Sequence, residues 1–469
     1  MIKKIFTFFL TIVPLVILFA QPWIFQNATF PGGTGNTNNI TGIHVVDANT
    51  VWAYTDTLNP YGFYTRTSNG GTTWVSGNAE VSTNPEFNIR NISAANANVA
   101  WEMVNIANKG NVYKTINGGT AWTPQKQLLS WGYIVHFFDV NNGVAVGDPK
   151  APATTTKYEI FTTQDGGTTW NQVSYSDIPL PNTVVTTNQF EFPTSYYTKG
   201  NTIFFLTRQI IHTTLNSDNT YNYVYKQRIY KSTDKGLVWT VLPNTFTDSY
   251  FSTGANTGLM AWSNQNKGIV FQLRYQDWQT LIPLSLNIYR TLDGGATWNN
   301  VSYTGISLPS HNISAVDYVP NTDILVATGK NGGSWKSIDN GSTWTVIDQG
   351  VKRFDVKCFD ADNCYSGGTT IWPNVPGGMY KLSITALSTD EVKEQWEKLG
   401  VYPNPTKDEL NIITERKIKS FTLTDMQGRK IKDLESSKKI DLSHFTNGLY
   451  ILNIYFSDGT SSSVKVQKE

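Results

Sequence analysis

A short stretch that recurs six times constrains the fold of this 469-residue chain more than any other feature. Its third copy, Thr162 to Trp170, reads Thr-Thr-Gln-Asp-Gly-Gly-Thr-Thr-Trp, and all copies share the pattern Ser/Thr-x-Asp/Asn-x-Gly-x-x-Trp. Recurrence at a roughly regular period indicates a repeat protein, in which each unit buries its apolar surface against the next. The Asp/Asn position is occupied by Asn69, Asn117, Asp165, Asp234, Asp293 and Asp339.

The residue types in this stretch are those of a closed turn between two strands. Hydroxyl and carboxylate oxygens accept hydrogen bonds from nearby backbone N–H groups. Gly167 permits a positive φ, and Trp170 covers the turn with a large apolar side chain. A basic residue precedes most copies, as Lys114 and Arg290 do. We therefore expect a structural turn rather than a metal-binding or ligand-binding loop.

The pattern resembles the Asp-box (BNR) repeat of sialidase-like β-propellers, sortilin-type receptors, xyloglucan-cleaving glycosidases and photosystem assembly-factor propellers. The resemblance covers most of the chain. It implies an all-β propeller in which each box joins the third and fourth strands of a blade, away from the active face. It implies little about activity.

The spacing of the boxes predicts seven blades over residues 21–382. The box tryptophans lie 48, 48, 69, 59 and 46 residues apart, and each interval has room for the four short strands of one blade. A seventh unit without a box ends at Met379 to Leu382. Trp23 to Gln26 resembles the strands that follow the boxes, so we predict that it completes this blade and leaves no free sheet edge there.

Blades four and five are longer than the others, and their extra residues are aromatic and polar. Tyr196, Tyr197 and Trp278 are examples. Long insertions on a rigid scaffold commonly carry binding surfaces. An extended hairpin without a ligand explains the same residues, and the sequence leaves both interpretations open.

Residues 1–20 predict a secretory signal peptide, because two lysines precede an apolar run and a small residue ends it. The alternative, an uncleaved membrane anchor, would be short for a span. Export implies an oxidising environment, so we expect Cys358 and Cys364, which flank an Asp/Asn-rich turn, to form a disulfide. The five histidines show no metal-ligand spacing, and neither a metal nor another cofactor is predicted. The net charge of +1 indicates no nucleic-acid partner.

The composition changes near residue 383, where a charged linker over 383–400 precedes a domain over 401–469. Alternating strands in that domain predict a small Ig-like β-sandwich. Tyr402 to Pro405, Asp425 to Arg429 and Asn447 to Tyr450 resemble the C-terminal sorting domain of the type IX secretion system of Bacteroidetes. The resemblance implies that residues 401–469 engage that machinery and direct the chain through the periplasm. The product is then secreted or held at the outer cell surface, with membrane association only by anchoring after export.

A glycosidase is one functional hypothesis. A sialidase needs three arginines, a tyrosine activated by a glutamate, and an acid, and its Arg-Ile-Pro signature is absent near the start of this chain. Arg66 and Arg290 occupy the basic position before a box and are predicted to be structural. Other glycosidases need two carboxylates that flank the scissile bond. Many aspartates here lie in boxes or in hairpin turns, as Asp47, Asp139 and Asp360 do.

A binding protein is the other hypothesis, and the one we favour from the sequence. Residues just before the first strand of each blade should point toward the central opening of the ring. Arg90, Trp131, His311 and Arg353 stand there, and cationic and aromatic groups suit an anionic or glycan ligand. We predict a non-catalytic propeller that binds a polysaccharide, peptide or protein. The alternative is a secreted glycoside hydrolase of sialidase-like or xyloglucanase-like type.

Overall fold

The chain divides into two compact units, Met1–Ser383 and Ile384–Glu469, and each is described by itself. The computed structural model describes residues 22–28, 40–55, 62–78, 87–150, 157–179, 189–215, 221–243, 249–251, 255–276, 282–308, 311–368, 378–385, 399–402, 405–414, 417–425, 429–434, 437–457 and 461–469. The predicted signal peptide and most of the predicted linker lie outside these residues. Within them, no helix is long and apolar enough to cross a membrane.

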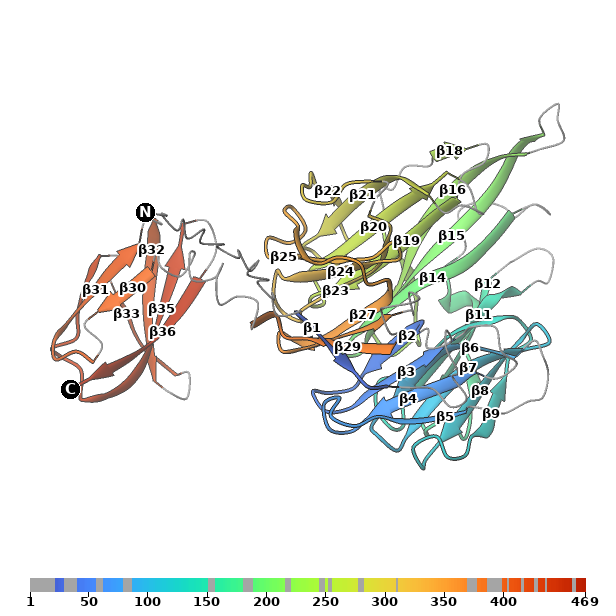
Figure 1. The fold of residues 1–469 in the computed structure, drawn as a ribbon, viewed down its shortest axis with the longest axis horizontal. Coiled ribbons are helices and arrows are strands. Elements are labelled where there is room, and N and C mark those ends of the chain that lie inside the picture. The colour runs from blue at the N-terminus through green and yellow to red at the C-terminus, as the bar shows by residue number, and fades with distance from the viewer. Residues whose placement is uncertain are drawn as a thin grey trace, which may run out of the picture. The chain divides into compact units, whose positions relative to one another are not determined.

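The first four blades follow one another along the chain as antiparallel sheets (Figure 1). Blade one consists of β2 (Gly42–Val45), β3 (Val51–Thr55), β4 (Phe63–Thr67) and β5 (Val75–Asn78). Blade two consists of β6 (Asn88–Ala94), β7 (Ala100–Ile106), β8 (Lys109–Thr115) and β9 (Thr123–Gln127). Blade three consists of β10 (Gly132–Phe137), β11 (Gly143–Lys150), β12 (Lys157–Thr163) and β13 (Asn171–Gln172), followed by the 3-10 turn η1 (Tyr175–Asp177). Blade four consists of β14 (Gln189–Lys199), β15 (Thr202–Leu215), β16 (Tyr221–Ser232), β17 (Thr240–Val241) and β18 (Ser249–Phe251).

Three further blades complete the ring. Blade five consists of β19 (Ala255–Trp262), β20 (Gly268–Tyr275), β21 (Pro283–Thr291) and β22 (Asn299–Asn300). Blade six consists of β23 (Ile313–Tyr318), β24 (Leu325–Gly329), β25 (Ser334–Ser337) and β26 (Thr345–Asp348). Blade seven consists of β27 (Arg353–Asp360), β28 (Asn363–Gly368), β29 (Gly378–Leu382) and β1 (Trp23–Gln26). The first strand of blade seven contacts that of blade one, so the ring is closed.

The N-terminal strand closes the ring as the sequence predicts. β1 pairs antiparallel with β29, with Trp23 opposite Leu382 and Gln26 opposite Met379. The Trp23 side chain is buried, and its indole N–H donates to Ser334 Oγ of blade six at 2.8 Å. Closure therefore joins the two ends of the propeller by backbone pairing and by a buried side chain.

Each box forms the expected turn. In blade three the Gly167 N–H donates to Thr163 Oγ1 at 2.9 Å, and the Thr169 N–H donates to Asp165 Oδ1 at 2.8 Å. Gly167 has a φ of 94°, which explains the glycine. The bond from the glycine N–H to the Ser/Thr hydroxyl recurs in the other five boxes, at 2.8 to 3.0 Å. The boxes thus fasten the outer half of the first six blades.

The basic residue before a box links neighbouring blades. The Lys114 ammonium of blade two donates to the Gly166 carbonyl in the box of blade three at 2.9 Å. Hydrogen bonds to a charged donor are stronger than neutral ones, so the contact helps to fix one blade against the next. The equivalent bonds are Arg66 to Gly118, Lys231 to Gly294, Arg290 to Asn340 and Lys381 to Gly70.

The insertion in blade four lengthens its strands. β14, β15 and β16 contain 11, 14 and 12 residues and form one long antiparallel ribbon that projects beyond the neighbouring blades (Figure 1). The extended hairpin is therefore present, while Tyr196 and Tyr197 lie at the inner end of β14. Trp278 of the blade-five insertion lies outside the described residues.

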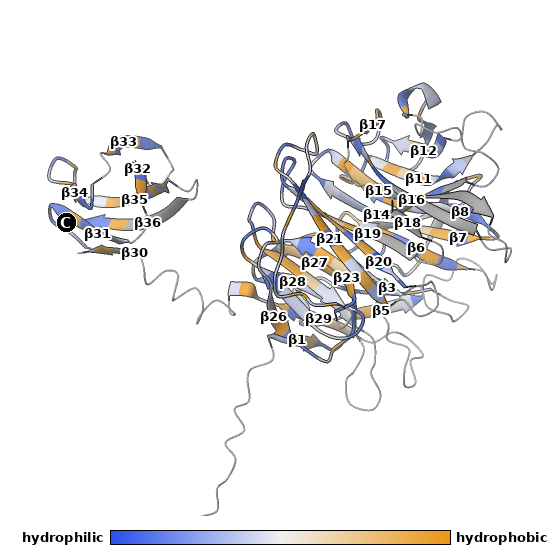
Figure 2. Cartoon of the chain, turned by 90° about the horizontal axis from the view of Figure 1, so that it is seen from above, coloured by the Kyte–Doolittle hydropathy of each residue, from blue (hydrophilic) through white to orange (hydrophobic). Residues whose placement is uncertain are grey.

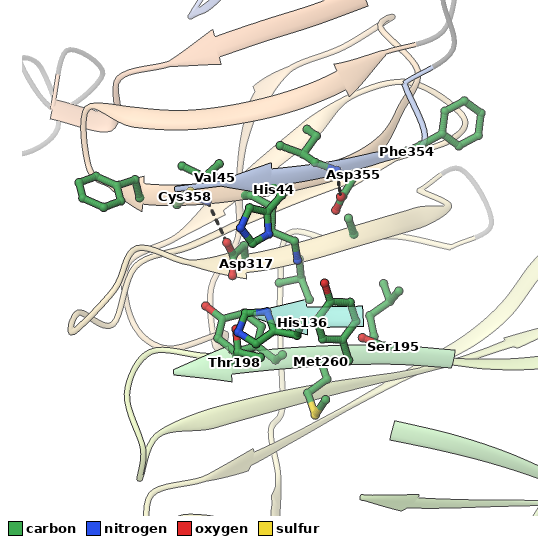
Figure 3. Close-up of a pocket in the computed structure, with 18 of the residues that line it drawn as sticks. His44, Val45, His136, Ser195, Thr198, Met260, Asp317, Phe354, Asp355 and Cys358 are labelled. Carbon is green, nitrogen blue, oxygen red and sulfur yellow. Dashed lines mark hydrogen bonds between the residues drawn. The ribbon is translucent and has the colours of Figure 1, made fainter. Parts of the chain in front are cut away.

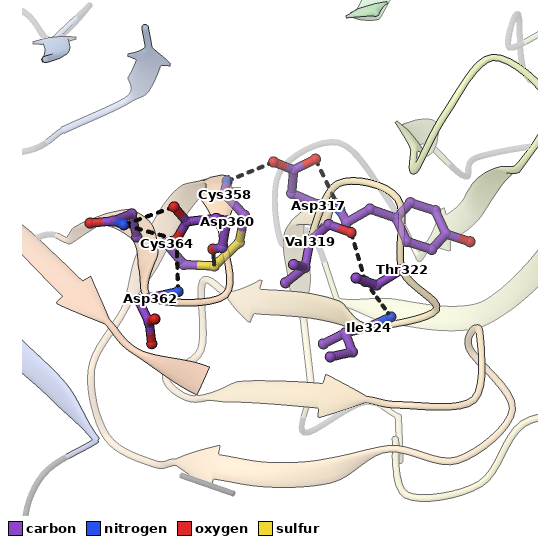
Figure 4. Close-up of a disulfide and its surroundings, with 10 residues drawn as sticks. Asp317, Val319, Thr322, Ile324, Cys358, Asp360, Asp362 and Cys364 are labelled. Carbon is purple, nitrogen blue, oxygen red and sulfur yellow. Dashed lines mark hydrogen bonds between the residues drawn. A yellow bond between two sulfur atoms is a disulfide. The ribbon is translucent and has the colours of Figure 1, made fainter. Parts of the chain in front are cut away.

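The disulfide expected from the sequence is confirmed. Cys358 on β27 and Cys364 on β28 pair directly across a hairpin and their sulfurs are bonded (Figure 4). The turn between them is closed by Asp360, whose carboxylate accepts from the Asp362 N–H at 2.8 Å. Asp47 and Asp139 close hairpin turns in the same way, as predicted.

The C-terminal unit is a small β-sandwich whose two sheets bury their apolar residues between them (Figure 2). Its two sheets contribute to one buried cluster that includes Leu410, Phe421 and Leu452. One sheet has the order β30 (Leu399–Tyr402), β31 (Glu409–Thr414), β34 (Lys439–Asp441). The other has the order β33 (Lys430–Leu434), β32 (Ile418–Asp425), β35 (Gly448–Phe456), β36 (Ser461–Lys468).

Candidate functional site

A cavity of about 600 Å³ occupies the centre of the ring (Figure 3). The first strand of every blade contributes to its lining, so the cavity belongs to the ring as a whole and to no single repeat. Representative lining residues, one from each blade, are Ile43, Ile92, His136, Tyr196, Met260, Asp317 and Asp355.

A β-bulge in five of the inner strands sets which side chains reach the cavity. The register of β6, β10, β23 and β27 shifts by one residue near the start of each strand, and that of β14 shifts in the middle of the strand. An extra residue re-aims the side chains that follow it. The third residue after the bulge is polar in every strand. In β10, β14, β23 and β27 this residue lines the cavity: His136, Tyr197, Asp317 and Lys357. In β6 it is Ser93, which does not line the cavity.

Two carboxylates of the cavity fasten neighbouring blades. Asp317 of blade six accepts from the Cys358 N–H of blade seven at 2.8 Å, a bond drawn in Figure 4. Asp355 of blade seven accepts from the Ile43 N–H of blade one at 2.9 Å. Each carboxylate also accepts from the N–H of the residue that follows it. The Asn91 side chain links blades two and three in a similar way. Its Nδ2 donates to the Val135 carbonyl oxygen, and its Oδ1 accepts from the Val135 N–H.

The charges in the cavity compensate one another. Burial raises the pKa values of Asp317 and Asp355, while the nearby Lys357 ammonium opposes that rise. Burial lowers the pKa of Lys357, but the two carboxylates outweigh it and leave that pKa raised. Lys199, which also interacts with Asp317, has its pKa lowered by burial. Two acidic and two basic side chains therefore share the lining.

Two histidines from different blades also line the cavity. His44 and His136 have ring centroids 6.3 Å apart, and Figure 3 shows them on facing strands. Burial lowers their pKa values to about 4 and about 3, so both imidazoles are neutral at physiological pH. His44 Nε2 lies 3.1 Å from the Ala94 carbonyl oxygen. His136 is 7 % exposed, and its Nδ1 has no hydrogen-bond partner among the described residues.

Arg90, predicted from the sequence, is the bulge residue of β6 and begins a stack across three blades. Its guanidinium lies 5.6 Å from the ring centre of Tyr133, whose ring stacks at 6.3 Å on Phe192. At the other end of the stack, the Arg208 guanidinium lies over Phe192, 4.5 Å from the centre of its ring. Tyr133 also makes a side-chain hydrogen bond with Asp148. Burial raises the pKa of Asp148 to about 6.

The other predicted ligand-binding residues lie elsewhere. Arg353 is 0 % exposed, because its guanidinium makes bonds of 3.0 and 2.8 Å to Asp348 and packs against the Trp23 ring. His311 accepts from the Ser307 N–H at 3.0 Å, and its ring centroid lies 4.5 Å from that of Trp335. Trp131 is half-buried just before β10. None of the four predicted residues lines the cavity.

Sequence reasoning missed most of the cavity residues. His44, His136, Asp317 and Lys357 lie far apart along the chain, and none forms a motif with its sequence neighbours. The available signal was the repeat itself, because aligning the inner strands places a polar residue at the same position in five blades. Among the described residues, no group of three or more His, Cys, Asp or Glu side chains could hold a metal ion.

The C-terminal unit matches a known family. Residues 400–469 match the family described as "Secretion system C-terminal sorting domain". This domain marks proteins that the type IX secretion system exports to the cell surface or to the medium. It therefore implies an interaction with that machinery. No curated protein matches the chain.

Several solved structures are similar to this chain at low sequence identity and with TM-scores below 0.5. "YCF48 from Cyanidioschyzon merolae" is 15% identical, with a TM-score of 0.45, over 75% of this chain and 97% of that one. PorZ, described as a surface component of the type IX system of Porphyromonas gingivalis, is 13% identical with a TM-score of 0.42. That match covers 93% of this chain and 60% of PorZ. The GH74 enzyme of Niastella koreensis is 14% identical with a TM-score of 0.36, over 96% and 74%. At such identities the likeness concerns the fold alone.

Proposed function

We propose that this exported propeller is a non-catalytic protein that binds a polysaccharide, peptide or protein. The proposal rests mainly on the hydrogen bonds and the charge partner of the two cavity carboxylates. Asp317 and Asp355 each accept two backbone N–H groups, and both lie beside the Lys357 ammonium.

A glycosidase uses its two carboxylates differently. One must carry a proton for the leaving group, and the other must face the sugar as a base or nucleophile. Carboxylates that join blades cannot leave those bonds without weakening the ring, because a buried N–H group left without an acceptor costs about 1–3 kcal/mol. The cavity therefore favours binding over hydrolysis.

A sialidase-like arrangement is disfavoured by burial. Tyr158 lies near Glu191, as a nucleophilic tyrosine and its activating glutamate would. However, Tyr158 is only 2 % exposed and packs inside blades three and four. Glu191 is held by Arg228 at 3.2 Å and by the Thr207 hydroxyl at 2.7 Å. The tyrosine oxygen is thus out of reach of an extracellular polymer.

One observation favours hydrolysis as a second candidate. The Asp148 carboxyl has its pKa raised to about 6 by burial, and such an acid can donate a proton near neutral pH. It would need a second carboxylate at about 5–10 Å to act in a glycosidase. An Asp148→Asn variant tests this candidate directly, because release of reducing sugar from a polysaccharide would disappear with the carboxyl group.

The binding proposal is tested with the full chain and immobilised polysaccharides and peptides. We expect retention on at least one of them, without release of reducing sugar, and weaker retention of an Arg90→Ala/Tyr133→Ala variant. An Arg429→Ala variant, changed at an exposed side chain of the C-terminal unit, serves as the control. Thermal melting confirms that each variant is folded. Turnover of a bound polysaccharide that Asp148→Asn abolishes would replace the binding proposal with the hydrolase.

A further inference from the structure

The charge balance of the cavity restricts what can enter it. Asp317 and Asp355 face Lys199 and Lys357, and the two imidazoles of the lining are neutral. A charged ligand would bring an unpaired charge into a largely buried site, and the desolvation of such a charge is costly. The lining therefore favours a ligand without net charge.

Polar side chains of blades three and four line the same space. His136 is one of them; its Nδ1 is covered by protein atoms and has no partner among the described residues, so a ligand would have to reach the other ring nitrogen. The Tyr196 hydroxyl accepts from Asn91 Nδ2 at 3.1 Å, and its own proton can be donated to a ligand. Ser195 and Thr198, on the same strand as Tyr196, also line the cavity (Figure 3). A hydroxyl group both donates and accepts hydrogen bonds, so these side chains suit a ligand that carries hydroxyl groups of its own.

Apolar side chains also contribute to the lining. They include Leu259 and Met260 of blade five and Phe354 of blade seven. A sugar ring with hydroxyl groups at its edge and C–H groups on its face matches a lining that contains both polar and apolar side chains. The volume of about 600 Å³ also falls within the range of about 300–1,000 Å³ that is typical of small-ligand sites.

We infer that the central cavity binds an uncharged, hydroxyl-rich ligand, a terminal saccharide unit of a neutral glycan, with His136 and Tyr196 as hydrogen-bonding partners. The inference rests on the proposed binding function and adds the chemical class and the place of the ligand. The Arg90–Tyr133 stack lies outside the cavity lining, so variants of the two places separate the two claims.

Titration calorimetry of the full chain with soluble probes tests the inference. The neutral probes are cellotriose, xylotriose and maltotriose; trigalacturonic acid is the charged counterpart, and a capped alanine tripeptide is the peptide counterpart. We expect at least one neutral trisaccharide to bind more tightly than both counterparts. His136→Phe keeps an aromatic ring and removes the nitrogens, and Tyr196→Phe removes only the hydroxyl. Each should weaken binding about tenfold, since one buried hydrogen bond is worth about 1–2 kcal/mol. His444→Phe changes an exposed histidine of the C-terminal unit and should bind like the wild type.

The outcomes distinguish this inference from the proposed function. If polymer retention depends on Arg90 and Tyr133 while trisaccharides bind His136→Phe and Tyr196→Phe like the wild type, the binding function stands and the cavity assignment is overturned. Tighter binding of trigalacturonic acid or of the tripeptide overturns it too, as does the absence of binding by all three trisaccharides. Loss of retention on every polymer by the wild-type chain would refute the binding function itself.

Discussion

Glu102 on β7 is a buried carboxyl that the structure leaves without a partner. It is 0 % exposed, and neither of its oxygens has a hydrogen-bond partner among the described residues. Burial raises its pKa well above the usual value, so the folded protein keeps the carboxyl protonated. The unfolded chain releases that proton above about pH 4.3. The contribution of this group to stability is therefore fully present below that pH and falls as the pH rises toward the folded-state pKa of Glu102.

Glu102→Gln should remove this pH dependence. Between the two pKa values the wild type loses about 1.4 kcal/mol of unfolding free energy per pH unit through this group. The variant has no proton to lose, so its melting temperature should change less between pH 5 and pH 8. Calorimetric melting of both proteins across this range is the measurement, with the exposed Glu409→Gln as control. Parallel curves for Glu102→Gln and the wild type would contradict the assignment.

We expect the disulfide between Cys358 and Cys364 to stabilise the propeller. Cys358 and Cys364 are separated by six positions, and a loop of this size gives about 2 kcal/mol through the lost entropy of the unfolded chain. A Cys358→Ala/Cys364→Ala variant should lose that amount in guanidinium unfolding of the propeller. Reduction of the wild type should reproduce the loss, and reductant should leave the variant unchanged. Equal midpoints for the oxidised and reduced wild type would show that the bond adds no stability.

At the scale of the elements, the box turn depends on one hydroxyl oxygen. The buried Gly167 N–H bonds to Thr163 Oγ1, and a valine at 163 keeps the shape of the side chain without the acceptor. Thr163→Val should therefore cost about 1–3 kcal/mol of unfolding free energy, the usual cost of an unsatisfied buried N–H group. Thr168→Val is the matched control, because that exposed hydroxyl only donates to the Asp165 carbonyl. A similar loss in both variants would mean that the turn does not depend on this acceptor.

The same elements show what the sequence could reveal. The boxes were predictable because a turn is a local structure, and the side-chain hydrogen bonds that close it join residues within four positions, as Thr163 and Gly167 do. The strand that closes the ring was predictable because it resembles the other outer strands. The cavity was not, since His44, His136 and Asp317 come from three blades and meet only when the ring is complete. Arg353 stands at a ring-mouth position in the sequence, yet its ion pair with Asp348 and the cover of Trp23 hold it inside blade seven.

At the scale of the whole molecule, the ring is held by β1, and Trp23 is its anchor. Trp23 bonds to Ser334 of blade six and covers Arg353 of blade seven, while Ile24, the next residue of the strand, is 63 % exposed. Trp23→Ala should cost about 3–5 kcal/mol, as expected for a buried tryptophan. Ile24→Ala alters the same strand on its exposed face and should change stability by about 0.5 kcal/mol or less.

Calorimetry can measure this in the full chain. The two units are separate in their contacts, so we expect two transitions, of which only that of the propeller responds to Trp23→Ala. A loss of this size should lower its midpoint by about 5 °C or more. The transition of residues 384–469 should not move, because its core contains no side chain from the propeller. If Trp23→Ala and Ile24→Ala shifted the propeller transition equally, β1 would be an outer strand without a closing role. The stability of the ring would then have to come from the contacts between its inner strands.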